Sequence, residues 1–135
     1  MNDKKNGKNY ISKIAEKHVS GQLKMAPESA NSKVLKAMKK PDNNSFLSFC
    51  NMYKEYSRKF NKNQFISCYF IACHPAESRK EAESTHKFIE QYLDFSPEQV
   101  QIFTPTPSTW ATCAYYTGLD EEGNSIYVEK KQHKK

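Results

Sequence analysis

Acidic, hydroxyl, thiol and imidazole side chains are grouped in three short stretches, each of which begins like a strand and turns into a polar loop. These stretches are QLKMAPES, YFIACHPAES and VQIFTPTPST, at residues 22–29, 69–78 and 100–109. Helix-forming sequence separates them. Because the C-terminal ends of parallel strands meet at one edge of a sheet, we expect their side chains to converge on one ligand site.

The second stretch also satisfies the pattern C-x5-R, from Cys73 to Arg79, which is the phosphate loop of cysteine phosphatases. The cysteine ends a predicted strand, and the arginine opens a helix whose N-terminus could bind an anion. However, the loop has no glycine, and Glu77 would place a negative charge inside the anion site. A cysteine phosphatase-like module that uses Cys73-x5-Arg79 therefore stands as the alternative function.

The hydrophobic spacing predicts the elements that position these residues, in the order α-β-α-α-β-α-β. Strands are expected at residues 22–26, 64–74 and 100–104. Helices are expected from Asn9 to about His18, around Val34 to Met38, from Phe46 to Phe60, and from the capping box Ser78-x-x-Glu81 to Leu93. From Pro105 onward we expect a loop, with a turn at 120–124 and a short strand at 125–128.

This order predicts an α/β fold, namely a partial (β/α) barrel of about three parallel strands. Three strands cannot close a barrel and leave two open edges, so we expect self-association through these edges or a poorly ordered periphery. On the first strand Leu23 and Met25 would face the helices. Gln22 and Lys24 would then point into the barrel or, equally well, toward solvent.

Composition indicates one domain with a modest core, since the chain has 135 residues, 37% of them hydrophobic, and a mean hydropathy of −0.87. The sequence contains no apolar run long enough to span a membrane. Its charged N-terminus is not followed by the apolar stretch of a signal peptide, so a cytoplasmic location is expected.

The net charge is +6. Basic residues gather at both ends of the chain, and we interpret these ends as disordered tails rather than as a nucleic-acid-binding surface. The N-terminal tail is predicted at 1–8, and the segment 119–135 is predicted to be a turn followed by the C-terminal tail. Residues 9–118 form the predicted partial barrel.

The four cysteines do not predict a metal site. Cys50, Cys68, Cys73 and Cys113 show neither the two-residue gap of a zinc knuckle nor the C-x-x-x-C-x-x-C spacing that seats a four-iron cluster. Cys68 and Cys73 are an odd number of positions apart on one predicted strand, so their side chains point to opposite faces. We therefore expect free thiols and no metal ligands.

Three ordered segments resemble the second half of a radical-SAM barrel. GQLKMAPESANSKVLKAMKKP resembles the strand that ends in a Glu-Ser pair, and FIACHPAES resembles the next strand end, usually written I-x-G-x-P-G-E-[ST]. VQIFTPTPSTWATCAYYTG resembles the last strand and its loop. The sequences of three segments are most similar to the YgiQ-type branch of uncharacterised radical-SAM proteins, namely HVSGQLKMAPES, YFIACHP and TPTPSTWATCAYYTG. This resemblance covers most of residues 9–130.

The resemblance implies that the chain is the C-terminal fragment of an iron–sulfur enzyme of unknown substrate, catalytically silent alone. The complete protein would use S-adenosylmethionine and a 4Fe-4S cluster, neither bound tightly by this chain. The implied partner is the missing N-terminal half of the barrel, and neither a membrane nor nucleic acid is expected as a partner. The cofactor-binding residues carried over by position are Lys24, Glu28, Ser29, Ile71 and Cys73, and those at the substrate entrance are His74 and Thr104.

Simpler roles for these residues remain open. Glu28 could be a carboxylate favoured by the dipole of the following helix, and His74 could be a surface turn residue. Cys73 and Ala76 stand where many relatives of the resembling family have glycine. A close approach of a cofactor to the backbone at these two positions is thus open to question.

Overall fold

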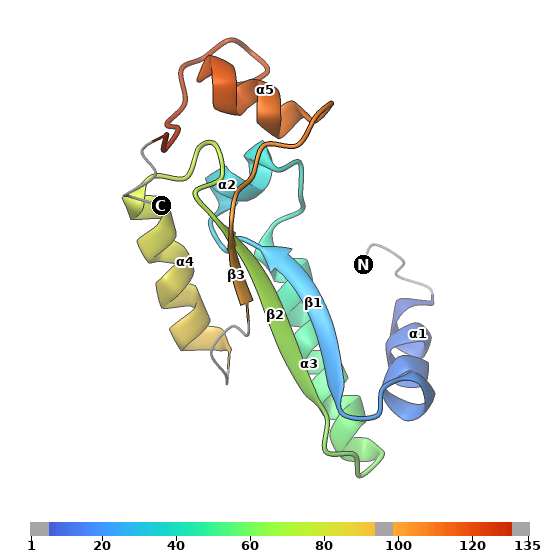
Figure 1. The fold of residues 1–135 in the computed structure, drawn as a ribbon. Coiled ribbons are helices and arrows are strands. Elements are labelled where there is room, and N and C mark those ends of the chain that lie inside the picture. The colour runs from blue at the N-terminus through green and yellow to red at the C-terminus, as the bar shows by residue number, and fades with distance from the viewer. Residues whose placement is uncertain (1–5, 94–98, 131–135) are drawn as a thin grey trace.

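The computed structural model describes residues 6–93 and 99–130, which form a three-stranded parallel sheet with helices packed on it (Figure 1). None of the helices within these ranges is long and apolar enough to cross a membrane. The elements in chain order are α1 (Gly7–Lys13), the π-helical turn η1 (Ile14–His18), β1 (Gln22–Glu28), α2 (Ser32–Ala37), α3 (Asn43–Lys59), β2 (Phe65–Ala72), α4 (Arg79–Tyr92), β3 (Gln99–Ile102) and α5 (Trp110–Thr117).

The strands lie in the order β1-β2-β3, and each neighbouring pair is parallel. Helices α2 and α3 connect β1 to β2, and α4 connects β2 to β3. Because parallel strands need a crossover, this alternation of strand and helix is the arrangement predicted from the hydrophobic spacing. The predicted α/β class is confirmed, and the observed unit is a partial β/α fold.

The hydrophobic core lies between β2 and the helices α1 and α3. Ile66, Cys68 and Phe70 alternate along β2 and are each at most 2% exposed. They meet buried side chains of α1, η1 and α3, among which Tyr53 is 1% exposed. Burial of these alternate positions fixes which face of the sheet the helices cover.

The ends of several elements differ by a few residues from the prediction. The first helix begins at Gly7, two residues before the predicted start at Asn9, and the first five residues of the segment 1–8 lie outside the described ranges. Strand β1 continues through Pro27, which has no amide hydrogen to donate. Proline is tolerated there because β1 is an edge strand of the described sheet, and its outer side needs no hydrogen bond to a neighbouring strand. The predicted capping box of Ser78 and Glu81 is confirmed at the start of α4.

The prediction of a loop from Pro105 onward is wrong, because residues 110–117 form helix α5. The Thr109 hydroxyl accepts a hydrogen bond from the amide of Thr112 at the N-terminus, and Gly118 ends the helix with a left-handed φ of 71°. These two caps were visible in the sequence as a threonine and a glycine nine positions apart. The predicted turn at 120–124 is present, and the predicted strand at 125–128 is reduced to a single bridge between Leu119 and Ser125.

We expect the chain to self-associate through the outer edge of β3. Val100 and Ile102 are 56% and 44% exposed there, and β3 pairs only with β2 among the described strands. Replacing Val100 by lysine adds charge to the open edge and should shift light scattering toward monomer. The matched control is Ser84→Lys on the exposed side of α4, which should leave the association state unchanged. A well-folded monomer at high concentration for the unsubstituted chain would contradict the expectation.

Candidate cofactor and ligand site at the strand ends

The C-terminal ends of the three strands lie side by side and bring together side chains from all three predicted stretches. Glu28 lies opposite Phe70 in the β1–β2 register, and its charge acts on His74, just beyond β2. The His74 ring lies edge-on to the ring of Phe103, with centroids 5.0 Å apart. The amide of Phe103 also donates to the carbonyl of Ala72 at 2.8 Å, which extends the β2–β3 pairing. The expected convergence is therefore present for Glu28 and His74.

His74 is a buried, neutral acceptor rather than a surface turn residue. It is 5% exposed, and its Nδ1 lies 2.8 Å from the carbonyl oxygen of Pro75. Burial lowers the pKa of His74, an effect opposed by the bond to Pro75 and by the charge of Glu28. Because a carbonyl oxygen can only accept, Nδ1 carries the proton and Nε2 presents a lone pair. The imidazole can thus accept a hydrogen bond from a ligand.

Glu28 ends β1 in an unusual backbone conformation. Its φ is 66°, in the left-handed region that costs a residue with a side chain about 1–3 kcal/mol. Its carboxylate forms an ion pair of 2.8 Å with the ammonium of Lys40, which also donates to the carbonyl of Ala26. Glu28 keeps 24% of its side chain exposed, so the carboxylate remains accessible to a ligand.

Ser29, the second residue of the Glu-Ser pair, is fully buried and points into the protein. Its hydroxyl lies 3.3 Å from the hydroxyl of Thr85 on α4 and accepts the amide of Asn31 at 3.2 Å. The amide of Ala30 also donates to Thr85. In this arrangement Ser29 fixes the loop before α2 against α4, and any contact with a ligand would be indirect.

The loop after β2 follows the backbone path of glycine although it contains none. Cys73 and Ala76 have φ values of 61° and 76°. Because glycine adopts such angles without steric cost, these are the two positions where glycine would be easiest to accommodate. Cys73 and Ala76, where many relatives of the resembling family have glycine, thus have a backbone conformation that favours glycine. Unlike glycine, however, Cys73 and Ala76 carry side chains, which limit how closely a ligand can approach the backbone.

Glu77 occupies the place that an anion would take in a phosphate loop. The amide of Cys73 donates to its Oε2 at 2.5 Å, and the amide of His74 donates to the same carboxylate. Arg79 turns away from the loop, with 94% of its side chain exposed, and pairs with Glu83 at 3.0 Å. The amides that would bind a phosphate are therefore already bonded to Glu77, and the arginine that would contact it points away from the loop. The C-x5-R arrangement does not support phosphatase chemistry.

The remaining predicted site residues differ in how far they lie from this strand-end cluster. Lys24 is exposed and pairs in register with Ser67, four residues before Ile71, which is about 13 Å along a strand. Ile71 is half-buried at the end of β2. Thr104 is exposed, and its hydroxyl donates to the carbonyl of Ile102 at 3.4 Å. The structure thus brings Glu28 and His74 together, with Cys73 next to His74 in the chain, and leaves Lys24 farther back along β1.

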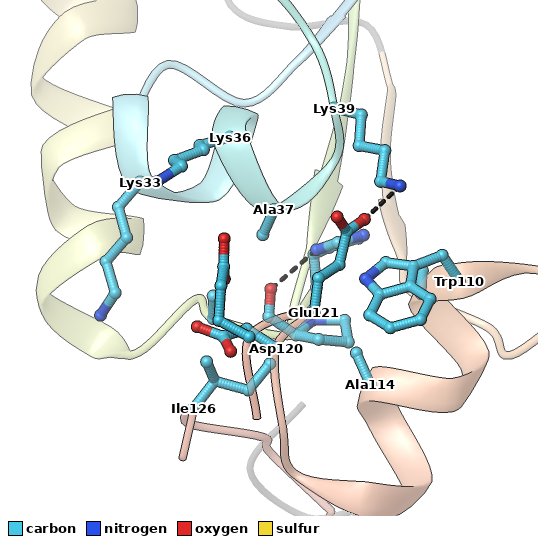
Figure 2. Close-up of a pocket in the computed structure, with 14 residues that line it drawn as sticks. Lys33, Lys36, Ala37, Lys39, Trp110, Ala114, Asp120, Glu121 and Ile126 are labelled. Carbon is cyan, nitrogen blue, oxygen red and sulfur yellow. Dashed lines mark hydrogen bonds and ion pairs between the residues drawn. The ribbon is translucent and has the colours of Figure 1, made fainter. Parts of the chain in front are cut away.

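A cavity of about 380 Å³ lies beside His74, between α2, α5 and the turn after α5 (Figure 2). Lys39 pairs across it with Glu121 and lies 5.4 Å from the ring centroid of Trp110. These contacts hold α5 and its turn against α2. Sequence reasoning missed this cavity because it treated the segment of Trp110 as loop. The charged residues of its lining are Lys33, Lys36, Lys39, Asp120, Glu121 and Glu122.

The cysteines do not form a metal site. Within residues 6–93 and 99–130, no group of three His, Cys, Asp or Glu side chains is placed to hold a metal ion. Burial raises the pKa of Cys50 to about 11 and that of Cys68 to about 12, and both thiols face the core. The expectation of thiols rather than disulfides agrees with the structure.

We expect the thiols to differ strongly in reactivity toward Ellman's reagent at pH 8. Cys113 is exposed, whereas burial and a raised pKa should slow Cys50 and Cys68 by more than about a hundredfold. The substitution Cys113→Ser should remove one thiol from the fast phase and leave the slow phase unchanged. Equal rates at Cys50 and Cys113 would mean that the core between β2 and α3 is open in solution.

The described strand ends offer a hydrogen-bond acceptor and an apolar surface to a ligand, but no set of side chains that could hold an iron–sulfur cluster. The accessible carboxylate of Glu28 can accept hydrogen bonds from ribose hydroxyls, and half-buried Ile71 offers an apolar surface to a base. The described residues offer no ligand set for the cluster. Any such cluster would have to be held by another part of the protein.

No family model matches the chain. It is 40% identical over 136 aligned positions to a UPF0313 protein of Fusobacterium nucleatum, which covers 100% of this chain. Similarity to UPF0313 proteins therefore extends along the whole chain. A UPF0313 protein of Thermotoga petrophila is 43% identical over 84% of the chain, and one of Clostridium botulinum is 39% identical over 93% of it.

The chain spans only 20–24% of the length of these UPF0313 relatives. This proportion is what a fragment of a larger protein would show.

Proposed function

We propose that this chain supplies the second half of a radical-SAM barrel of the YgiQ type, within a protein built like the longer UPF0313 relatives. The observation that carries the proposal is the convergence of Glu28, Cys73 and His74 at one end of a parallel sheet with two open edges. A half-barrel has this geometry, because its strand ends line one side of a site that the other half completes.

Each residue of the cluster has a task in this proposal. Glu28 accepts hydrogen bonds from the ribose or the amino-acid portion of S-adenosylmethionine, and Lys40 holds its carboxylate in place. Ile71, which is half-buried, and the backbone at Cys73 would lie beside the adenine. His74 accepts a hydrogen bond on the substrate side, next to the cavity of Figure 2. Ser29 acts as a positioning residue through Thr85.

The cofactors carry the reaction chemistry in this proposal. When bound in the complete protein, S-adenosylmethionine and the cluster would supply radical chemistry. This chain contributes hydrogen-bond acceptors, an apolar wall and exclusion of water. The partner is the N-terminal half of the barrel, docked against the open edges of β1 or β3, where Val100 and Ile102 expose apolar surface.

The isolated chain is expected to bind S-adenosylmethionine weakly or not at all. It presents one accessible carboxylate and one side of the proposed site, and the remaining contacts belong to the missing half. Isothermal titration calorimetry measures this directly. A low-micromolar affinity of the 135-residue chain would contradict the half-site and show that this chain holds the cofactor alone.

The experiment that tests the proposal begins with the DNA upstream of Met1 in the source organism. A reading frame that encodes C-x-x-x-C-x-x-C, in or just before this one, would allow the reunited protein to be expressed and reconstituted anaerobically with iron and sulfide. Formation of 5′-deoxyadenosine from S-adenosylmethionine by that protein would support the proposal. The lack of any such frame, together with no cofactor cleavage in a full-length UPF0313 relative, would overturn it.

A further inference from the structure

The loop at residues 73–78 has the properties of an anion-binding site. Its first two amides, those of Cys73 and His74, converge on one carboxylate, that of Glu77. Converging backbone amides of this kind form an anion-binding concavity. Glu77 is 5% exposed, so its carboxylate is enclosed by the loop and lies away from solvent.

The same loop contains two residues in a conformation that their side chains disfavour. Cys73 and Ala76 both have left-handed φ values. The amide of Glu77 donates back to the carbonyl of His74 at 2.9 Å, and the amide of Ala76 donates to the carbonyl of Tyr127 at 2.9 Å. The carboxylate bridges the start and the end of the strained turn, and its contacts therefore oppose relaxation of Cys73.

The groups around Glu77 shift the pKa of its carboxyl in opposite directions. Burial raises the pKa of Glu77, and the charge of Glu81 raises it further. The amides of Cys73 and His74 lower it, because they stabilise the ionised carboxylate. Glu81 is itself held by Ser78, which lowers the pKa of Glu81 to about 2 and keeps it ionised. The two amides are thus the groups that make a buried charge tolerable at Glu77.

We propose that residues 73–78 form an anion-binding loop that binds the carboxylate of its own Glu77, and that this internal anion holds the strand end in the backbone path that glycine would otherwise provide. Glu77 is accordingly a positioning residue. It sets the conformation of Cys73 and His74, the residues that face the proposed ligand site. The loop geometry stands whether or not the chain belongs to a cofactor-binding protein.

The test replaces the internal anion with a free one in the 135-residue chain. Glu77→Ala removes a group with the composition of acetate, so sodium acetate is the probe and sodium chloride at equal ionic strength is the reference. The variant should lose several degrees of Tm, and acetate should restore part of the loss in a saturable manner. Glu77→Gln fills the same space without charge, so neither it nor the unsubstituted chain should respond to acetate beyond chloride.

The same substitution is also made in a second variant of the chain, which tests the positioning role and gives a result even if Glu77→Ala fails to fold in the native sequence. In Cys73→Gly/Ala76→Gly the left-handed conformation costs little, so the loss of Tm caused by Glu77→Ala should be smaller than in the native sequence. Acetate rescue in either background, together with a smaller loss of Tm beside the two glycines, supports the proposal. Identical responses of Glu77→Ala to acetate and chloride in both backgrounds, or an undiminished loss of Tm beside the two glycines, would overturn the proposal.

Discussion

Replacing Phe70 by alanine is expected to lower the free energy of unfolding by about 3–5 kcal/mol, which is a large fraction of the stability of a small domain. Phe70 lies on the central strand β2, is 2% exposed and belongs to the core that joins β2 to α1 and α3. The substitution removes buried apolar surface and leaves a cavity that the neighbouring strands cannot fill. Urea denaturation followed by circular dichroism measures the loss.

The matched control for this prediction is Phe65→Ala on the same strand. Phe65 is 54% exposed, so its truncation removes little buried surface and should change the free energy of unfolding by less than about 1 kcal/mol. Equal losses at Phe65 and Phe70 would mean that the chain buries both faces of β2 in solution. That result would indicate that association of the chain covers the open face of the sheet.

Replacing Glu28 by glutamine in the reunited protein is expected to weaken binding of S-adenosylmethionine by about 10- to 100-fold, because a hydrogen bond to a charged group is worth about 1.5–3 kcal/mol. Glu28 is the accessible carboxylate of the strand-end cluster. Equilibrium binding of the cofactor to the reconstituted protein, with the unfolding midpoint measured in parallel, gives the effect.

Lys40→Met is the control that separates cofactor binding from the Glu28–Lys40 ion pair. It removes the partner of Glu28 and leaves the carboxylate in place. If Glu28 contacts the cofactor, Lys40→Met should have a clearly smaller effect on affinity than Glu28→Gln. If the two substitutions weaken binding equally, Glu28 serves only to hold Lys40, and its assignment to the cofactor fails.

Much of the fold follows from local sequence. The nearly continuous apolar run at residues 64–74 predicted a strand, and the capping box of Ser78 and Glu81 predicted the start of α4. Both signals act within a few residues, so they can be recognised without knowledge of the rest of the chain. Helix α5 had equally local caps, at Thr109 and Gly118, but it was overlooked because the prolines before it suggested a loop.

Part of the candidate site could also be predicted, because the ends of parallel strands must lie at one edge of a sheet. That reasoning placed Glu28 near His74, as the structure does. It did not reveal that Ser29 points into the protein toward Thr85, which is 56 positions away in the chain. Nor did it reveal the pairing of Lys39 with Glu121 across the cavity.

The sequence by itself determined the α/β order, the three strand ends and the types of side chain available there. Only the tertiary structure decided which of those side chains are accessible. The carboxylate of Glu77 turns inward to the amides of Cys73 and His74, whereas Arg79 turns outward to Glu83. The physical reason is that such choices depend on backbone angles and on partners brought together by folding, and a spacing such as C-x5-R contains neither.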